Sequence, residues 1–345
     1  MNVNKIMANR LFWPVVMLIV LLIINLLAFP GFFSVQVRDG HLFGSLIDIL
    51  RNGSPTLMIA VGMTLVIATR GIDLSVGAVC AISGAVACSI ILGSSDPGSP
   101  ATVTVAVVVS LLISLVLGLW NGFLVAVVGI QPIIATLILM TAGRGVAMLI
   151  TEGQILTVNS PPFKAIGSGF FLGLPISVLI AAAIFVFALV LTRRTALGLM
   201  IEAVGINPEA SRLAGVRARG LLIAVYVFTA LCAAIAGLVL TSNQTAADAN
   251  NTGLFIELDA ILAVVIGGTS LAGGRYSLLG TLIGALVIQT LVTTVYTVGS
   301  PPIATMVFKA AVVTVVCLLQ SPRTTELIES ARRRNARRRA KAVTA

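Results

Sequence analysis

The sequence predicts an all-α integral membrane protein with about ten transmembrane helices and with both termini in the cytoplasm. Hydrophobic residues make up 58% of the 345 residues, charged residues make up only 10%, and the mean hydropathy is +1.10. A soluble domain carries about 25% charged residues, so this chain has too few to cover a soluble core. Apolar runs of roughly 20 residues, the length that crosses a bilayer core of about 30 Å, recur along the whole chain.

Polar turns divide these apolar stretches into separate candidate spans. Pro132 lacks a backbone N–H and biases the preceding residue away from helix, so GIQP at 129–132 is expected to form a tight turn. The count of ten would change if one of the short runs 74–92, 133–150 or 257–271 were re-entrant. The runs are 11–29, 47–69, 74–92, 103–128, 133–150, 171–191, 221–240, 257–271, 278–294 and 303–319.

The predicted domain organisation is one membrane domain, residues 11–320, between a short N-terminal segment, residues 1–10, and a basic tail, residues 321–345. Within the domain lies a polar stretch, here called the basic segment, at 192–220. It cannot lie in hydrocarbon, and short loops rich in Lys and Arg stay in the cytoplasm. Its glycines separate short helix-forming pieces, which is typical of a folded surface for a soluble partner. Its arginines are Arg193, Arg194, Arg212, Arg217 and Arg219.

The net charge of +10 is mainly a topology signal. Most of the 22 Lys and Arg residues fall in the N-terminal segment, the basic segment and the basic tail, all on the predicted cytoplasmic side. We therefore expect contact with anionic membrane lipid and no nucleic-acid partner. Binding of RNA by the tail is the alternative.

No arrangement of residues indicates chemistry. The sequence has one histidine, His41, no phosphate-binding GxxxxGK[ST] loop, and no cluster of nucleophile, base or metal ligands. We expect no enzyme activity, no catalytic residue, no metal site and no cofactor. If ATP drives the protein, another chain binds it.

Ionisable and amide side chains near membrane depth are the candidates for a translocation path, because burying a charge there is costly unless it is paired or faces water. Asp73 lies three residues after Arg70, and a local ion pair or helix cap is the structural alternative. Arg144 lies between two glycines, and pairing with a carboxylate or with carbonyls is its alternative. An interhelical hydrogen bond is the alternative for Asn121. For Asp248, Glu257 and Asp259 the alternative is that they are ordinary polar residues of a solvated loop. The full set is Asp73, Asn121, Arg144, Asp248, Glu257 and Asp259.

Two glycine-rich stretches are loosely alike, GIDLSVGAVCAISGAV at 71–86 and GGRYSLLGTLIGALV at 273–287. A duplicated half would suit a transporter. Chance similarity of apolar, glycine-rich sequence is the other interpretation.

Four motifs carry a resemblance to a known family. IATRGIDLSVGAV (67–79), NGFLVAVVGIQPIIATLILM (121–140), EAVGINPEASRLAGV (202–216) and AVVIGGTSLAGGRYSLLGTLIGALVI (263–288) resemble the permease subunits of sugar-importing ABC transporters of the ribose/xylose/arabinose type. The resemblance runs from about residue 48 to residue 319. In finer detail the chain is most similar to the permease of a galactofuranose importer.

The resemblance implies a permease that provides the path for a monosaccharide, galactofuranose or a related pentose or hexose. It implies three partners: a cytoplasmic ATPase with two fused nucleotide-binding halves, a periplasmic sugar-binding protein, and a second permease subunit, identical or not. It also implies a bacterial inner-membrane location. The basic tail departs from the family pattern. The competing function is a free-standing secondary transporter or channel for a small polar solute. By position, the resemblance gives the ATPase-coupling role to Glu202, Ala203, Gly205, Asn207 and Gly215.

Overall fold

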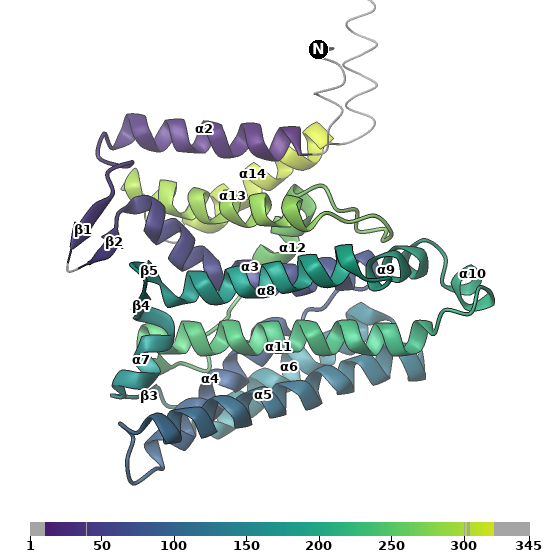
Figure 1. Cartoon of the computed structure of the whole chain (residues 1–345), viewed down its shortest axis with the longest axis horizontal. Helices are drawn as coiled ribbons and strands as arrows, with labels where there is room; N and C mark the ends of the chain where they lie inside the picture. Colours follow the sequence, from purple (N-terminus) through teal and green to yellow (C-terminus); the bar gives the residue numbers. More distant parts are fainter. Residues whose placement is uncertain (1–10, 39, 300, 302–303, 321–345) are drawn as a thin grey trace, which may run out of the picture.

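The computed structural model describes residues 11–38, 40–299, 301 and 304–320 as a bundle of long, roughly aligned helices (Figure 1). The predicted N-terminal segment and basic tail lie outside the described residues. The helices are α2 (Phe12–Ala28), α3 (Ser45–Ala68), α4 (Val76–Leu92), α5 (Pro100–Phe123), which continues as the π-helical turn η1 (Leu124–Val128), α6 (Pro132–Ile150), α7 (Pro161–Ser168), α8 (Ile176–Arg194), α9 (Leu197–Ile206), α10 (Pro208–Leu213), α11 (Ala218–Gln244), α12 (Ile256–Ile266), α13 (Leu278–Thr297) and α14 (Ala304–Gln320).

Short antiparallel strand pairs join the loops at one end of the bundle, which we call the hairpin end (Figure 1). One pair joins two loops that are far apart in sequence, at Leu156–Thr157 and Ala246–Ala247. The strands are β1 (Gln36–Arg38) with β2 (His41–Phe43), β3 (Leu156–Thr157) with β6 (Ala246–Ala247), and β4 (Phe170–Phe171) with β5 (Leu174–Pro175).

Each expected apolar run contains a helix, but not every helix is long enough to cross a membrane. In the described part of the chain, six helices are long and apolar enough to span: α3, α5 with η1, α6, α8, α11 and α13. The helices α2 and α4 have 17 residues each. The helix α12 has 11 residues, about 16 Å at 1.5 Å per residue, or roughly half of the bilayer core. The expected full span at 257–271 is therefore a half-length helix, and the count of ten spans stays a prediction.

The helices pack as two halves with the same internal arrangement. Helix α11 packs against α3, α4 and α5, and helix α3 packs against α11, α12 and α13. Helix α4 packs on α5 and α6, as α12 packs on α13 and α14, and α4 and α12 contact each other. Exchanging α3 with α11, α4 with α12, α5 with α13 and α6 with α14 therefore preserves this set of contacts. Because α3 starts at the hairpin end and α11 at the opposite end, the halves form an inverted repeat (Figure 1).

This repeat differs from the one suggested by the two glycine-rich stretches. The stretch 71–86 leads into α4, whereas 273–287 leads into α13, which corresponds to α5. The likeness of the two stretches is therefore not the sign of the duplication. The halves share helix packing without a sequence signature at these positions.

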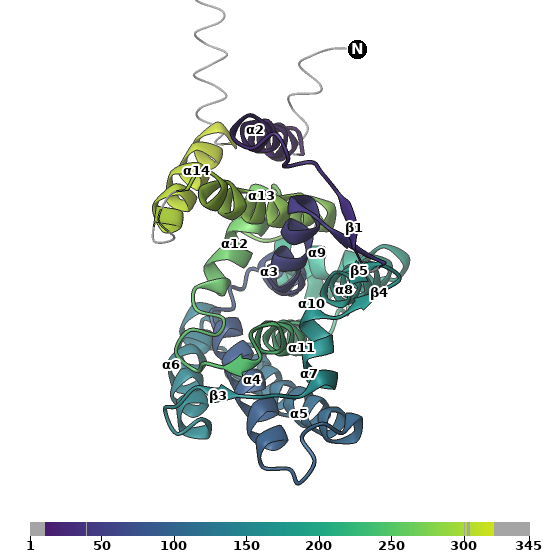
Figure 2. The ribbon, with the colours of Figure 1, turned by 90° about the vertical axis from the view of Figure 1, so that its left-hand side faces the viewer.

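Small residues allow the central helices to approach closely. A Cβ added to Gly237 of α11 would lie 2.6 Å from the Cα of Cys80 in α4. One added to Gly62 of α3 would lie 2.8 Å from the Cα of Thr229 in α11. Small side chains at helix contacts are typical of membrane bundles, where backbones pack directly on one another. These contacts hold α3, α4 and α11 at the centre, as the end-on view shows (Figure 2).

The basic segment folds at the end opposite the hairpins, as α9, α10 and the start of α11 (Figure 1). The first residues of α2 and the last described residues of α14 lie at this same end (Figure 1). The parity of the predicted spans requires this arrangement. The side of the membrane on which this end lies stays a prediction.

Candidate docking segment and polar contacts at membrane depth

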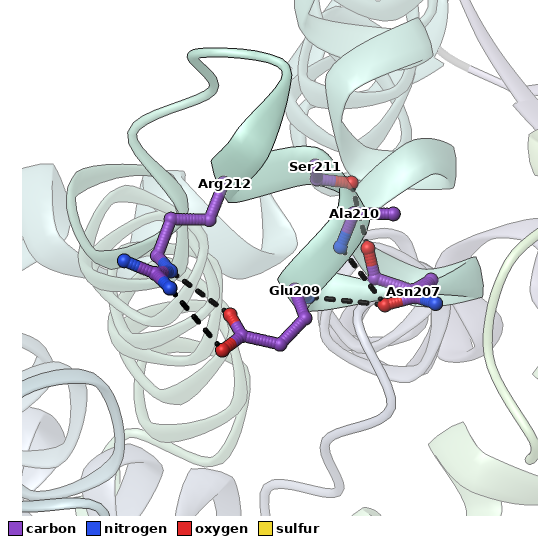
Figure 3. Close-up of polar contacts among 5 residues, drawn as sticks. All are labelled: Asn207, Glu209, Ala210, Ser211 and Arg212. Carbon is purple, nitrogen blue, oxygen red and sulfur yellow. Dashed lines mark hydrogen bonds and ion pairs between the residues drawn. The ribbon is translucent and has the colours of Figure 1, made fainter.

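The basic segment is a folded, capped surface. Asn207 closes the gap between α9 and α10, because its Oδ1 accepts hydrogen bonds from the backbone N–H groups of Glu209 (3.1 Å) and Ala210 (3.0 Å) (Figure 3). Pro208 takes the first helical position, where a missing N–H costs nothing. Gly215, with φ of +86°, ends the turn, a left-handed conformation that glycine adopts without strain.

One ion pair lies on the outer face of α10. Arg212 Nε lies 2.9 Å from Glu209 Oε2, and both side chains are exposed (Figure 3). The hydrogen bond and charge of Arg212 lower the pKa of the Glu209 carboxyl. Solvent screens such a pair, so it defines the charge of the surface more than it stabilises the fold.

The five residues with an implied coupling role differ in exposure. Asn207 and Gly215 are exposed, Glu202 and Ala203 are half-buried, and Gly205 is buried. Exposed apolar side chains accompany them: Leu199 is 73% exposed, Ile206 58% and Leu213 83%. Exposed apolar side chains grouped on a folded polar segment are typical of a surface that contacts a protein or the membrane interface.

A cavity of about 310 Å³ opens beside α9. Its lining includes Arg193 at the end of α8, Glu202 on α9, and Tyr276 in the turn before α13. Both signs of charge therefore face the same recess, in which an inserted polar side chain would find a partner of either sign.

Gly205 sits at a junction of three backbones. A Cβ at this position would lie 2.7 Å from the backbone N of Gly274 and 3.0 Å from the carbonyl carbon of Ala68. The same two residues are hydrogen-bonded to each other, Gly274 N–H to Ala68 O at 2.8 Å. Helix α9 thus rests directly on the end of α3 and on the turn at 267–277, with no side chain between them.

At membrane depth, Asp73 and Asn121 are linked through a third residue. Asp73 Oδ1 accepts hydrogen bonds from the backbone N–H (2.9 Å) and hydroxyl (2.6 Å) of Ser75, and Asn121 Nδ2 donates to the Ser75 hydroxyl oxygen (2.8 Å). All three are buried. Asp73 does not pair with Arg70, whose guanidinium donates to backbone carbonyls elsewhere, so the interpretation of a local Arg70–Asp73 ion pair is wrong.

The non-helical backbone before α4 is also hydrogen-bonded by a side chain. The hydroxyl of Thr136 in α6 accepts from Leu74 N–H at 3.1 Å, and its one hydrogen has two acceptors within reach, Pro132 O in the same helix at 2.9 Å and Ile72 O at 3.2 Å. Non-helical backbone at membrane depth persists only where protein groups or water satisfy it. Sequence reasoning missed Ser75 and Thr136, because small hydroxyl residues in apolar runs give no signal by themselves.

Arg144 likewise forms hydrogen bonds with the non-helical backbone before α12. Its Nη1 donates to the carbonyls of Ala249 (2.9 Å) and Thr252 (2.7 Å), in the segment between α11 and α12. This outcome matches the structural alternative for Arg144, pairing with backbone carbonyls. Asp248 lies at the start of the same segment and accepts three hydrogen bonds, from the backbone N–H groups of Asn250 and Asn251 and the side-chain amide of Asn251.

Glu257 lies where α4, from one half of the inverted repeat, meets α12, from the other half. Its side chain is buried, 6% exposed, on the first turn of α12. Only a glycine fits opposite it, since a Cβ at Gly77 on the first turn of α4 would lie 2.5 Å from Glu257 Oε2 and 2.6 Å from Gly253 O. The carboxylate therefore faces the amino end of α4, where the helix dipole favours negative charge.

Asp259 is bound to a residue that the sequence reasoning did not select. Lys309 Nζ in α14 lies 2.6 Å from Asp259 Oδ2 and 2.8 Å from Oδ1, and both side chains are about one-fifth exposed. The signal was available, since Lys309 is a lysine inside an apolar run. Among the described residues, the six path candidates thus form three groups: Asp73 with Asn121, Arg144 with Asp248 and Glu257, and Asp259 with Lys309.

Within the described part of the chain, no group of His, Cys, Asp and Glu residues could hold a metal ion. Buried polar atoms are instead used to satisfy non-helical backbone and to join helices.

The comparisons with known proteins agree with a helical membrane protein. A family model described as "Branched-chain amino acid transport system / permease component" matches residues 45–317. The chain belongs to this permease family. Its members are the multi-pass, non-catalytic membrane subunits of bacterial ABC importers, which work with a separate ATPase and a binding protein; the ATPase binds the ATP, and the permease needs no cofactor.

Curated relatives match over nearly the whole chain. The galactofuranose transporter permease protein YtfT of Escherichia coli K12 is 50% identical over 334 residues, which cover 95% of this chain and 96% of the relative. The fructose import permease protein FruF of Bifidobacterium longum is 42% identical over 99% of this chain and 97% of its own length. The ribose import permease protein RbsC of Haemophilus influenzae is 38% identical over 87% of this chain and 90% of its own length. No solved structure matches the chain.

Proposed function

We propose that this permease provides the path for a monosaccharide, and that the sugar is galactofuranose or a related pentose or hexose. The strongest support is the 50% identity to the galactofuranose transporter permease over 95% of the chain. Relatives named for fructose and ribose support the wider class of sugar. A neutral sugar needs hydrogen-bonding groups and no fixed counter-charge. This fits a bundle in which Asp73, Arg144 and Asp259 are already paired or hydrogen-bonded within the chain.

The basic segment is the surface on which the ATPase docks, with the end that carries it in the cytoplasm. Leu199 and Leu213 supply exposed apolar contacts, and the capped turn around Asn207 and Gly215 holds them in a fixed shape. An ATPase groove that receives a short helix would bind this surface through such apolar anchors. Glu202 lines the adjoining cavity, which has room for a side chain of the ATPase, and half-buried Ala203 follows it on α9.

Gly205 has a different role from the exposed coupling residues. Being buried, it contacts the permease and not the ATPase. It allows α9 to lie on the backbones of Ala68 and Gly274. Movement of α9 is then transmitted by direct contact to the end of α3 and to the turn 267–277, because closely packed backbones move together as a rigid body.

The polar groups at membrane depth keep the two non-helical segments folded while the solute passes. Asp73, Asn121 and Arg144 hold the segments before α4 and α12, and Glu257 lies between these two helices. Asp248 shapes the loop that leads into the second segment, and Asp259 ties α12 to α14. In the importer, a second permease subunit completes the path, a periplasmic binding protein delivers the sugar, and the ATPase carries two fused nucleotide-binding halves. Residues 11–320 form the single membrane domain.

The test is reconstitution in proteoliposomes with the candidate ATPase and binding protein, with labelled galactofuranose, ribose and fructose supplied in turn. We expect uptake only when ATP, the ATPase and the binding protein are all present, and we expect galactofuranose to be taken up fastest. Uptake by the permease alone, driven by a sugar or proton gradient, would instead show a secondary transporter or channel.

A further inference from the structure

Arg70 occupies the point where three segments of the fold meet. It lies two residues after the end of α3, in the segment 69–75 that leads into helix α4. Its φ is +65°, in the left-handed region that a residue with a side chain rarely adopts. A strained arginine at a surface turn needs an explanation, because glycine or asparagine would fit this backbone at lower cost.

The guanidinium of Arg70 bridges two other segments. Nη2 donates to the carbonyl of Ile206, the last residue of α9, at 2.5 Å. Nε donates to the carbonyl of Ala272 at 3.1 Å, in the turn 267–277 between α12 and α13. The carbonyl of Ile206 is at a helix end, where it has no partner in the next turn of its own helix.

The surrounding backbone is built around this side chain. Gly273 has φ of +82°, and a Cβ at that position would collide with Arg70 Cγ. One residue further, Gly274 N–H donates to Ala68 O at 2.8 Å, beside buried Gly205. Arg70 thus fixes the end of α9 against both the segment that precedes α4 and the turn that follows α12.

We propose that Arg70 is the positioning residue that transmits movement of the docked basic segment to helix α4 and the half-length helix α12. The proposal rests on the function proposed above, in which the ATPase docks on the basic segment. Arginine suits the task and lysine does not, because only a guanidinium can donate from separate nitrogens to two carbonyls in different segments. The left-handed backbone conformation of Arg70 directs its side chain towards the carbonyls of Ile206 and Ala272, which accounts for the unfavourable φ.

The test compares Arg70→Gly, Arg70→Lys and Lys164→Ala in the reconstituted importer. Glycine removes the guanidinium while fitting the φ of +65°, so loss of folding through backbone strain is avoided. Lysine keeps the charge but cannot donate from two separate nitrogens. Lys164 is the control, an exposed cation on α7 and outside the basic segment.

The quantity measured is the number of sugar molecules imported per ATP hydrolysed, together with co-purification of the ATPase. For Arg70→Gly and Arg70→Lys we expect the ratio to fall about tenfold, within the range of roughly 5- to 150-fold of measured coupling between sites, while the ATPase still co-purifies. Lys164→Ala should keep the wild-type ratio. A wild-type ratio in both Arg70 variants, or loss of ATPase co-purification in Arg70→Gly, would overturn the proposal. Failure of the wild-type importer to take up sugar would instead refute the proposed function.

Discussion

Replacing Gly205 with alanine is the smallest change that tests how α9 rests on the rest of the molecule. The added Cβ would overlap the carbonyl oxygen of Ala68 and would lie 2.7 Å from Gly274 N, where an ordinary contact needs about 3.4 Å, so the backbones must separate by more than about 0.7 Å. Overpacking of this kind costs about 1–3 kcal/mol, and weakening of the Gly274–Ala68 hydrogen bond adds about 1 kcal/mol. We therefore expect Gly205→Ala to lose about 2–4 kcal/mol of local packing energy at this junction.

The matched control for this change is Gly220→Ala. Gly220 lies in the first turn of α11, in the same basic segment, and a Cβ there would meet nothing within 4 Å. Alanine favours helix over glycine by about 1 kcal/mol, so this variant should be neutral or slightly stabilised. Thermal unfolding of the two purified variants in detergent and sugar uptake in proteoliposomes are the assays. Gly205→Ala should melt earlier and import at least about fivefold more slowly, while remaining in the membrane.

The reasoning fails if Gly205→Ala melts and transports as the wild type does. It also fails if Gly205→Ala and Gly220→Ala behave alike, since the packing of the glycine against Ala68 and Gly274 is the only difference invoked. A variant that transports normally but melts earlier would separate packing from coupling and would contradict the coupling role alone.

Three further predictions concern charged side chains. Asp259→Asn and Lys309→Met should each destabilise the protein by about 2–4 kcal/mol, because each leaves a largely buried charge unpaired, whereas the double variant should recover most of the loss. Arg144→Ala should lower the melting temperature, because two backbone carbonyls at membrane depth lose their donor at a cost of about 1–3 kcal/mol each. Glu209→Gln should leave the melting temperature unchanged, because Glu209 and Arg212 are exposed to solvent.

Each of these has its own check. A double-mutant cycle that shows no coupling between Asp259 and Lys309 would contradict the ion pair. Wild-type melting of the alanine variant of Arg144 would contradict its role in holding the segment before α12. For Glu209, contact with Arg212 lowers the pKa of the folded carboxyl, so any stabilisation is present at neutral pH and lost only as the pH falls through that lowered pKa. The range from pH 8 to pH 6 lies about 2 pH units above the usual pKa of a carboxyl group. If the difference in unfolding stability between wild type and Glu209→Gln changed markedly within that range, the assignment of a lowered pKa to Glu209 would be wrong.

Helix positions were largely predictable because apolar length is a strong signal in a membrane protein. The run 47–69 is α3 within two residues at the start and one at the end. The run 257–271 was misjudged, because the uncharged glycine, threonine and serine residues at 267–270 were counted with the apolar helix, and hydropathy alone cannot distinguish a half-length helix from a full one. The inverted repeat was out of reach for a similar reason, since it is a property of packing and leaves no shared motif.

The sequence indicated which residues belong to the site, but not which groups they contact. Arg144 and Asp259 were selected because a charge at membrane depth must be compensated. Which carbonyls or which lysine compensate them depends on helices far away in sequence, such as α14 for Asp259. Gly205 was selected as part of a docking surface by resemblance. Only the three-dimensional packing shows that it is buried and acts toward the interior.

The most direct test of the account is photo-cross-linking from the basic segment to the ATPase. A photoreactive amino acid is placed at Asn207, which is exposed between α9 and α10, and as a control at Leu172, which is 87% exposed at the hairpin end. In the assembled importer, we predict a cross-link to the ATPase from position 207 and none from position 172. No cross-link from position 207, or an equal cross-link from both positions, would contradict the claim that the basic segment is the docking surface.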